Sequence, residues 1–297
     1  DHRDLHSFPT RRSSDLVTSI GETLAYVYNR VTTLPSAGFR AINTEYTAQE
    51  AKTTQVTTNL KVFGGKFQVD RVLQNNVKGI TDQVTFQLQQ KIKATKAVFS
   101  DSFVNGDSAV DAKSFDGIDK AVTGSSTELI PAAAIDLSTS ANITANANAL
   151  MDELDKMLAS LDGTPSAILL NRVMSSIMNG IARRSGYFST SDVDAFGKPI
   201  TKYQGVQLVP VGDKPGTANP IIPINAVDGT TSMLAIRIGL DGVHAASPAG
   251  NKLIHQYLPN MTAPGAIKDG EVEMVAAAVL KATRAAGILR KIKVKAI

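Results

Sequence analysis

The chain has 297 residues, of which 43% are hydrophobic, 20% charged and only 5% aromatic, and it contains neither Cys nor Trp. The lack of Cys excludes disulfides, thiolate zinc sites, iron–sulfur clusters and cysteine nucleophiles. Lys and Arg number 31 against 27 Asp and Glu, which gives a net charge of +4. Every unbroken apolar run is far shorter than the ~20 residues that span a bilayer, so we expect no membrane partner.

Residues 1–16 differ in character from the rest of the chain. One reading frame of a common sequencing adapter translates into residues 6–15 letter for letter. The segment also lacks the apolar core of a signal peptide. We therefore expect residues 1–16 to be a foreign adapter sequence rather than a natural basic arm, and the native N-terminus to lie elsewhere.

The next part of the chain predicts an arm followed by a β-hairpin. In residues 17–44 apolar side chains are sparse, and Pro35 and Gly38 interrupt the segment, which favours an extended arm. In residues 45–75 apolar and β-branched side chains alternate with polar ones on both sides of a Gly-Gly pair. Glycine tolerates positive φ, so Gly64 and Gly65 predict a two-residue hairpin turn.

A long helix follows, because the period of the apolar residues changes from two to between three and four. Residues 76–103 predict one amphipathic helix about 40 Å long, at about 1.5 Å per residue. Asn105 and Gly106 should end it. Residues 115–118 predict a turn into a short helix. The apolar stripe consists of Val77, Ile80, Val84, Leu88, Ile92, Thr95, Phe99 and Phe103.

The second half of the chain mixes helices and short strands. Helices are predicted at 142–161 and 173–184 by their apolar spacing, and strands are predicted by short β-branched or apolar runs. Two closing strands should end the chain. The resulting fold class is α+β. The predicted strands are 167–170, 206–211, 221–224, 233–238, 271–280 and 286–294.

The residue patterns of this sequence provide little support for a catalytic or metal-binding site. A hydrolase triad could be assembled from Asp241, His244 and Ser247, but no nucleophile-elbow spacing accompanies it. The acidic segments 152–155 and 192–194 lack the spacing of a calcium loop, and a solvated surface explains both. We expect no enzyme, metal or cofactor, with a hydrolase domain as the least favoured alternative.

The C-terminal basic segment predicts at most non-specific contact with nucleic acid. Lys291, Lys293 and Lys295 alternate with Ile292 and Val294, as on one solvated face of a half-buried strand. No groove-reading motif and no aromatic stacking platform accompanies these charges.

The arm and the hairpin have no core of their own. A two-stranded hairpin is marginal in water, so it must lie on its own domain or on a neighbouring subunit. A protruding hairpin next to a long helix suggests a subunit that interlocks with its copies. The expected assembly residues of the hairpin are Lys61, Phe63, Gly64, Gly65, Lys66, Phe67, Asp70 and Arg71.

Four sequence stretches, taken in order, resemble the tailed-bacteriophage major capsid protein family. They are residues 61–71 (KVFGGKFQVDR), 115–118 (FDGI), 237–244 (RIGLDGVH) and 281–290 (KATRAAGILR). The resemblance extends over residues 20–297. The fold of this family is shared with encapsulin shells and with the herpesvirus capsid floor.

The resemblance implies a division of the chain into the regions of that fold. Residues 17–44 would be the N-terminal arm, and 45–75 the extended loop that overlaps an adjacent subunit. Residues 76–137 would form the peripheral domain with its spine helix, and 138–262 the mixed α/β axial domain. Residues 263–297 would be closing strands that return to the peripheral domain.

The resemblance also implies a function. The chain would be a structural subunit of an icosahedral virus capsid, assembled through hexamers and pentamers in the host cytoplasm around non-specifically held double-stranded DNA. Portal and scaffold proteins would be further partners. An encapsulin-type shell with an enzyme cargo is the nearest alternative. If residues 45–75 are the protruding loop, deleting residues 53–70 should leave a folded body that no longer assembles.

Overall fold

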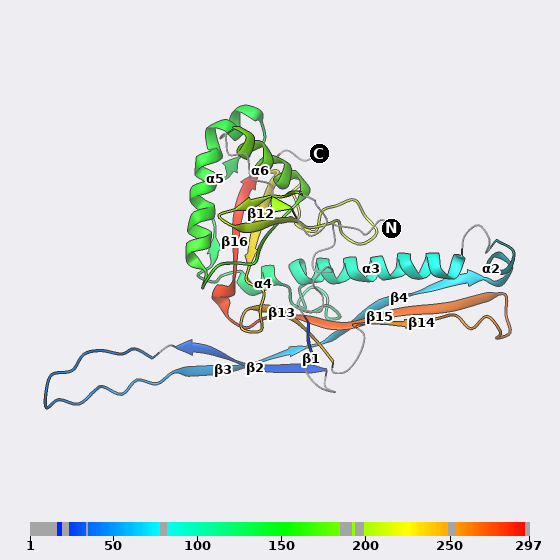
Figure 1. Cartoon of the computed structure of the whole chain (residues 1–297), viewed down its shortest axis with the longest axis horizontal. Helices are drawn as coiled ribbons and strands as arrows, with labels where there is room; N and C mark the ends of the chain where they lie inside the picture. Colours follow the sequence, from blue (N-terminus) through cyan, green and yellow to red (C-terminus); the bar gives the residue numbers. More distant parts are fainter. Residues whose placement is uncertain are drawn as a thin grey trace.

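The protein is an elongated molecule from which an upright part rises near the middle and a thin hairpin extends at one end (Figure 1). Residues 1–16, which resemble an adapter, lie outside the described residues. We call the elongated part, without the hairpin, the long unit and the upright part the upright unit. The computed structural model describes residues 17–19, 24–33, 35–77, 82–184, 192–193, 199–248 and 253–294.

The long unit is built on a five-stranded sheet. Its central strand pairs with β4 along one edge over ten residues and with β13 and then β14 along the other edge. Strand β1 adds to β13 in parallel. The strands are β1 (Val17–Ser19), β4 (Lys61–Asp70), β13 (Val243–Ser247), β14 (Ile254–Tyr257) and the central β15 (Ile267–Leu280).

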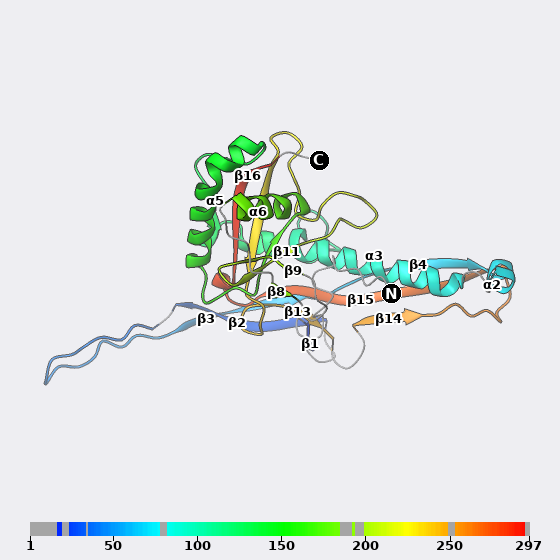
Figure 2. The ribbon, with the colours of Figure 1, turned by 45° about the horizontal axis from the view of Figure 1, so that its top comes forward.

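Helix α3 (Gln83–Asn105) lies along one face of this sheet, after the short α2 (Arg71–Val77) (Figure 2). Its apolar stripe packs on β4 and β15. The stripe confirms the predicted helix, but the predicted start at residue 76 is wrong. The carboxylate of Asp82 accepts hydrogen bonds from the backbone N–H and the hydroxyl of Thr85, so a new helix begins after α2.

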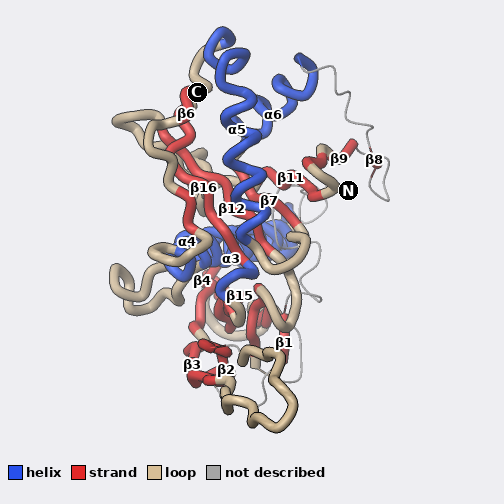
Figure 3. Tube along the Cα trace, turned by 90° about the vertical axis from the view of Figure 1, so that its left-hand side faces the viewer, coloured by secondary structure: helices blue, strands red, loops and turns tan. Residues whose placement is uncertain are grey.

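The upright unit contains a seven-stranded sheet covered on one face by α5 (Ser140–Ser160) and α6 (Arg172–Arg184) (Figure 3). Even-numbered side chains of β7, such as Ile168, pack with Leu150 and Leu154 of α5 and Met174 of α6. The strands are β5 (Glu128–Leu129), β6 (Ile135–Asp136), β7 (Ala167–Leu170), β10 (Lys202–Tyr203), β11 (Val206–Pro210), β12 (Thr230–Ile236) and β16 (Ala286–Lys293).

Three smaller elements complete the described chain. Helix α4 (Ile118–Val122) follows the turn that the sequence predicted at 115–118. The strands β8 (Asp192–Val193) and β9 (Pro199–Ile200) form a separate pair. The 3₁₀ turn η1 (Thr283–Ala285) links β15 to β16.

The last strand, β16, lies in a different sheet from the one expected. Strand β16 does not return beside β15; it lies in the upright sheet between β12 and β5. The turn η1 redirects the chain, and Arg237 after β12 donates its N–H to the carbonyl of Ala285. Conversely, β13 and β14, which fall within residues 138–262, belong to the long sheet. The segment 221–224, expected as a strand, forms no strand.

The hairpin also differs from the prediction. Strand β2 (Ala25–Thr33) pairs with β3 (Lys52–Asn59), and residues 34–51 connect them. The predicted turn at Gly64 and Gly65 is wrong, because β4 runs straight through both residues beside Glu273 and Val272 of β15. Residues 25–33 are therefore one strand of the hairpin and not part of an unpaired arm.

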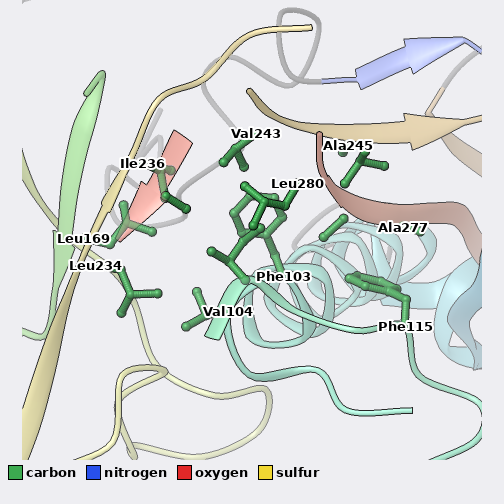
Figure 4. Packing of buried hydrophobic residues seen from close by; sticks show 14 of the residues in the cluster. Phe103, Val104, Phe115, Leu169, Leu234, Ile236, Val243, Ala245, Ala277 and Leu280 are labelled. Atoms are coloured by element: carbon green, nitrogen blue, oxygen red, sulfur yellow. The ribbon is translucent and has the colours of Figure 1, made fainter. Parts of the chain in front are cut away.

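A shared apolar core joins the two units. Phe103 at the end of α3 lies among side chains from the upright sheet, including Leu234 and Ile236, and from the long sheet, including Val243 and Leu280 (Figure 4). Odd-numbered β7 residues such as Leu169 face this core, while the even-numbered ones face α5 and α6. The upright sheet is therefore buried on both faces.

Candidate assembly surface

The β2–β3 hairpin protrudes from the body (Figures 1 and 2). Among the described residues, neither of its strands pairs with another strand. Every residue from 35 to 51 is exposed, and three large apolar side chains lie there: Phe39 at 109% exposure, Ile42 at 89% and Tyr46 at 66%. Exposed apolar side chains at the end of an isolated two-stranded ribbon are typical of a surface that another molecule covers.

The base of the hairpin is fixed to the long unit. The N–H of Leu60 donates to the carbonyl of Leu24 at 2.8 Å, which closes the base. The buried Tyr28 hydroxyl donates to the carbonyl of Leu280 at 3.1 Å. The Arg30 guanidinium donates to the carbonyl of Lys281 at 3.3 Å. The hairpin is therefore anchored where β15 ends, and its other end extends away from the body.

The eight residues that the sequence assigned to the protruding loop lie instead on the long unit. Phe63 packs against Phe99 and Phe115 with ring centroids 6.0 and 6.2 Å away. Phe67 is buried and covers Gly270 on the opposing strand, where a Cβ would come within 2.4 Å of its ring. Both aromatic side chains belong to the subunit's own core.

The polar members of the set also make contacts within the chain. Lys61 donates to the carbonyl of Ala112 at 2.8 Å, and Lys66 pairs with Asp269 at 2.7 Å. The carboxylate of Asp70 accepts from the N–H of Val72 at 2.7 Å, at the start of α2. Gly64 and Gly65 lie in β4, and the exposed Arg71 opens α2. Assigning this set to the protruding loop was therefore wrong.

The protruding segment that sequence reasoning missed is residues 35–51. A signal for it was present: Tyr26, Tyr28 and Arg30 alternate with outward residues, and Pro35 and Gly38 interrupt the chain just before the strand that begins at Lys52. The expected effect of deleting residues 53–70 changes accordingly. That deletion would remove β4 with its ten paired residues and disrupt the body itself.

The residues considered for a hydrolase do not form a triad. His244 and Ser247 lie three residues apart on β13, so their side chains point to opposite faces of the sheet. Asp241 is paired with Arg237 at 2.7 Å. Within the described part of the chain, no group of three or more His, Asp or Glu side chains is arranged to hold a metal ion.

The acidic segment 152–155 is a helix surface. Asp155 accepts hydrogen bonds from the hydroxyl of Tyr203 in β10 and from the side-chain amide of Gln204 in the turn after it. Burial and this carboxylate together raise the pKa of Tyr203. In the other acidic segment, residues 192–193 belong to β8 and residue 194 lies outside the described residues.

The basic C-terminal strand is partly neutralised by the chain itself. Arg290 pairs with Asp119 and Glu128. Burial opposes ionisation of Glu128, but the Gly124 N–H and Arg290 lower its pKa all the same. Lys293 lies 3.8 Å from Asp136, and residue 295 is outside the described residues. This strand is therefore a weak candidate for a phosphate-binding surface.

His244 makes stability depend on pH. Its ring is buried, meets the ring of Tyr26 edge-on at 5.6 Å, and makes no well-formed hydrogen bond to the described residues. Burial, reinforced by the charge of Lys281, lowers its pKa, and the Gly239 backbone opposes this shift without reversing it. The unfolded chain therefore binds a proton more readily than the fold does.

We expect the free energy of unfolding to fall as the pH drops below about 6.5, the ordinary histidine value. His244→Phe should remove this part of the pH dependence, because a neutral ring stays neutral. His255→Gln is the control, since that side chain is exposed. Denaturant midpoints measured between about pH 8 and about pH 5 compare the three proteins. Equal slopes in all three would contradict the assignment to His244.

None of the helices in the described ranges has the length and apolar character that a bilayer span requires. No protein-family model matches the chain. No curated protein matches it in sequence either.

Solved structures do match along the whole molecule. The holo-SrpI encapsulin complex from Synechococcus elongatus PCC 7942 aligns with a TM-score of 0.68 at 16% identity, covering 97% of this chain and 89% of that chain. The capsid of a native GTA particle gives a TM-score of 0.68 at 13% identity, with 98% and 93% covered.

A structure from Mycobacterium phage Bobi gives a TM-score of 0.62 at 12% identity, with 100% of this chain and 93% of that chain covered. Identities this low relate the proteins through their fold alone. The long sheet with its spanning helix, the upright α/β unit and the protruding hairpin are thus the parts of one known architecture. The chain has the α+β fold shared by tailed-bacteriophage major capsid proteins and encapsulins.

Proposed function

We propose that this chain is the structural subunit of an icosahedral phage capsid, which assembles from hexamers and pentamers and encloses double-stranded DNA. The observation that carries the proposal is the protruding β2–β3 hairpin with its exposed apolar residues Phe39, Ile42 and Tyr46. In the shell, adjacent copies of the chain would cover these exposed apolar side chains. The long unit would be the peripheral domain and the upright unit the axial domain.

The mechanism is geometric. A hairpin on one subunit that lies on a different surface of the next subunit makes a heterologous contact, and such contacts close into rings when the rotation between subunits permits it. The base of the hairpin is held by the hydrogen bonds of Tyr28 and Arg30 and by the contact of Tyr26 with His244, whereas residues 35–51 are exposed. The hairpin can therefore adjust between fivefold and sixfold rings while the shared core around Phe103 keeps the body rigid.

The subunit would also have partners other than its own copies. The DNA would be held by non-specific contacts with its phosphates, and portal and scaffold proteins would join during assembly in the host cytoplasm. The subunit would act in the virion as a structural protein and not as an enzyme. Among the eight residues of the long unit named above, the exposed Gly64 and Arg71 are proposed as contacts to neighbouring subunits.

The test is the assembly state of residues 17–297 produced without the adapter-like segment. We expect closed shells of uniform size in negative-stain images and a sedimentation coefficient far above that of a monomer. If few closed shells form, rings of five and six subunits would also support the proposal. A protein that stays monomeric at high concentration would contradict it.

An encapsulin-type shell is the second candidate, since one of the matching structures is a holo-encapsulin complex at 16% identity. The two functions differ in what the shell encloses. Particles isolated from their natural source should contain double-stranded DNA if the chain is a capsid protein, and a single enzyme if it forms a nanocompartment.

A further inference from the structure

The two faces of the long unit carry opposite charge. From residue 83 to 100, α3 contains three lysines and no acidic residue. The opposite face of the β4–β15 sheet carries four carboxylates and one lysine. The lysines of α3 are Lys91, Lys93 and Lys96, and the charged residues of the sheet face are Asp70, Asp269, Glu271, Glu273 and Lys66.

Strand register produces this separation. Alternate side chains of a strand point to opposite faces. In β4 the odd-numbered Phe67 and Val69 pack under α3, so the even-numbered residues lie on the open face. Lys66 lies directly opposite Glu271 and pairs diagonally with Asp269 at 2.7 Å. The open face keeps an excess of negative charge after this pairing.

Gly65 of β4 lies beneath the side chain of Lys91 of α3. A Cβ at this position would lie 3.3 Å from Cδ and 3.4 Å from Nζ of Lys91, so the absence of a side chain leaves room for that lysine to lie along the sheet. The pair Gly64–Gly65, from which the sequence predicts a hairpin turn, is thus compatible with a strand that lies beneath Lys91 of α3.

The exposed side of α3 is chemically suited to phosphate. It presents amide and ammonium groups, which are common donors to the nucleic-acid backbone. It has no motif that reads base edges, so the contact would be independent of sequence. The exposed residues here are Thr85, Phe86, Gln89, Gln90, Lys93 and Ala94.

In a closed shell one face of the long unit points inward in every subunit. We infer that α3 faces the lumen and that its lysines contact the phosphate backbone of enclosed double-stranded nucleic acid, while the carboxylate-bearing face of the sheet points outward. The inference rests on the proposed function. It favours the DNA-enclosing capsid over the encapsulin-type shell, because a polyanion is attracted to the basic face and repelled by the acidic one.

The orientation can be tested because the chain contains no cysteine. Gln90→Cys places a single thiol on α3, and Gln68→Cys places one on the opposite face; both positions are exposed. Shells of each variant would be treated with a polyethylene glycol maleimide too large to enter them. We expect Gln68→Cys shells to react while intact and Gln90→Cys shells to react only after dissociation.

The opposite labelling pattern, or equal reaction of both variants in intact shells, would overturn the inference. Negative-stain images of the same samples keep the two proposals apart. Absence of any shell contradicts the proposed function, whereas intact shells with reactive α3 thiols contradict only the orientation.

The contact with nucleic acid has its own test. Shells of the triple variant Lys91→Gln, Lys93→Gln, Lys96→Gln would be assembled with short duplex DNA and digested with nuclease. We expect them to retain several-fold less DNA than the unsubstituted chain. Equal retention would overturn the nucleic-acid assignment.

Single variants provide the matched control. Lys66→Gln removes one charge from the opposite face and should leave DNA retention and its salt dependence unchanged, whereas Lys93→Gln should lower both. If the triple variant does not assemble, this pair of single variants carries the test. Equal effects of Lys66→Gln and Lys93→Gln would contradict a preference for α3.

Discussion

Replacing residues 34–51 by Asn-Gly is expected to abolish shell formation and leave a folded subunit. Thr33 and Lys52 are paired across β2 and β3, so a two-residue turn can close the shortened hairpin without changing its register. The contacts that fix the base, from Tyr28 and Arg30 to the end of β15, remain in place. Sedimentation and electron microscopy measure assembly, and circular dichroism measures folding.

A matched control separates the side chains of the tip from its length. Substituting only Phe39, Ile42 and Tyr46 by Ser keeps the loop length and removes the exposed apolar area. We expect this variant to assemble poorly as well. Normal shells from the Asn-Gly variant would show that the protruding tip is dispensable and would remove the main support for the proposed function.

Phe103→Ala is expected to lower the free energy of unfolding by about 3–5 kcal/mol, the usual cost of removing a buried aromatic side chain. Phe103 is 1% exposed and touches the core where both sheets meet. The cavity would therefore weaken the junction between the long and upright units. Chemical denaturation in the shortened-hairpin background, where assembly does not contribute, measures the effect.

The same helix offers the control for this prediction. Phe86 lies near the start of α3 and is 45% exposed. Phe86→Ala should cost less than about 1 kcal/mol, because much of its ring is already in water. Similar losses for the two variants would mean that the core around Phe103 does not hold the units together.

Local signals predicted the long helices α3, α5 and α6 and the strands β7, β11, β12, β15 and β16, but they missed β2, β13 and β14. The stripe from Val84 to Phe103 fixes the face that α3 buries, and the apolar run of β7 marks a strand covered on both sides. The order of four motifs was enough to indicate the fold that solved structures show. None of these signals says which strands pair over long distances.

The wrong predictions arise because local sequence signals do not specify which distant strands pair. Gly64 and Gly65 suit a turn locally, but β15, about 200 residues later in sequence, pairs with β4 at ten positions and holds both glycines in a straight strand. The same limitation led to the expectation that both closing strands return to the peripheral domain, whereas β16 lies in the upright sheet. The assembly residues were assigned to the wrong ribbon because their position depends on this pairing.

The continuity of β3 with β4 has a mechanical consequence. Only Leu60 separates the two strands, so a pull on the hairpin tip would be transmitted directly into β4. Hydrogen bonds between antiparallel strands lie perpendicular to them, and tension along β4 would load its bonds to β15 in shear, all together instead of one after another. The ribbon can thus act as a tether whose tensile strength comes from the sheet beneath α3.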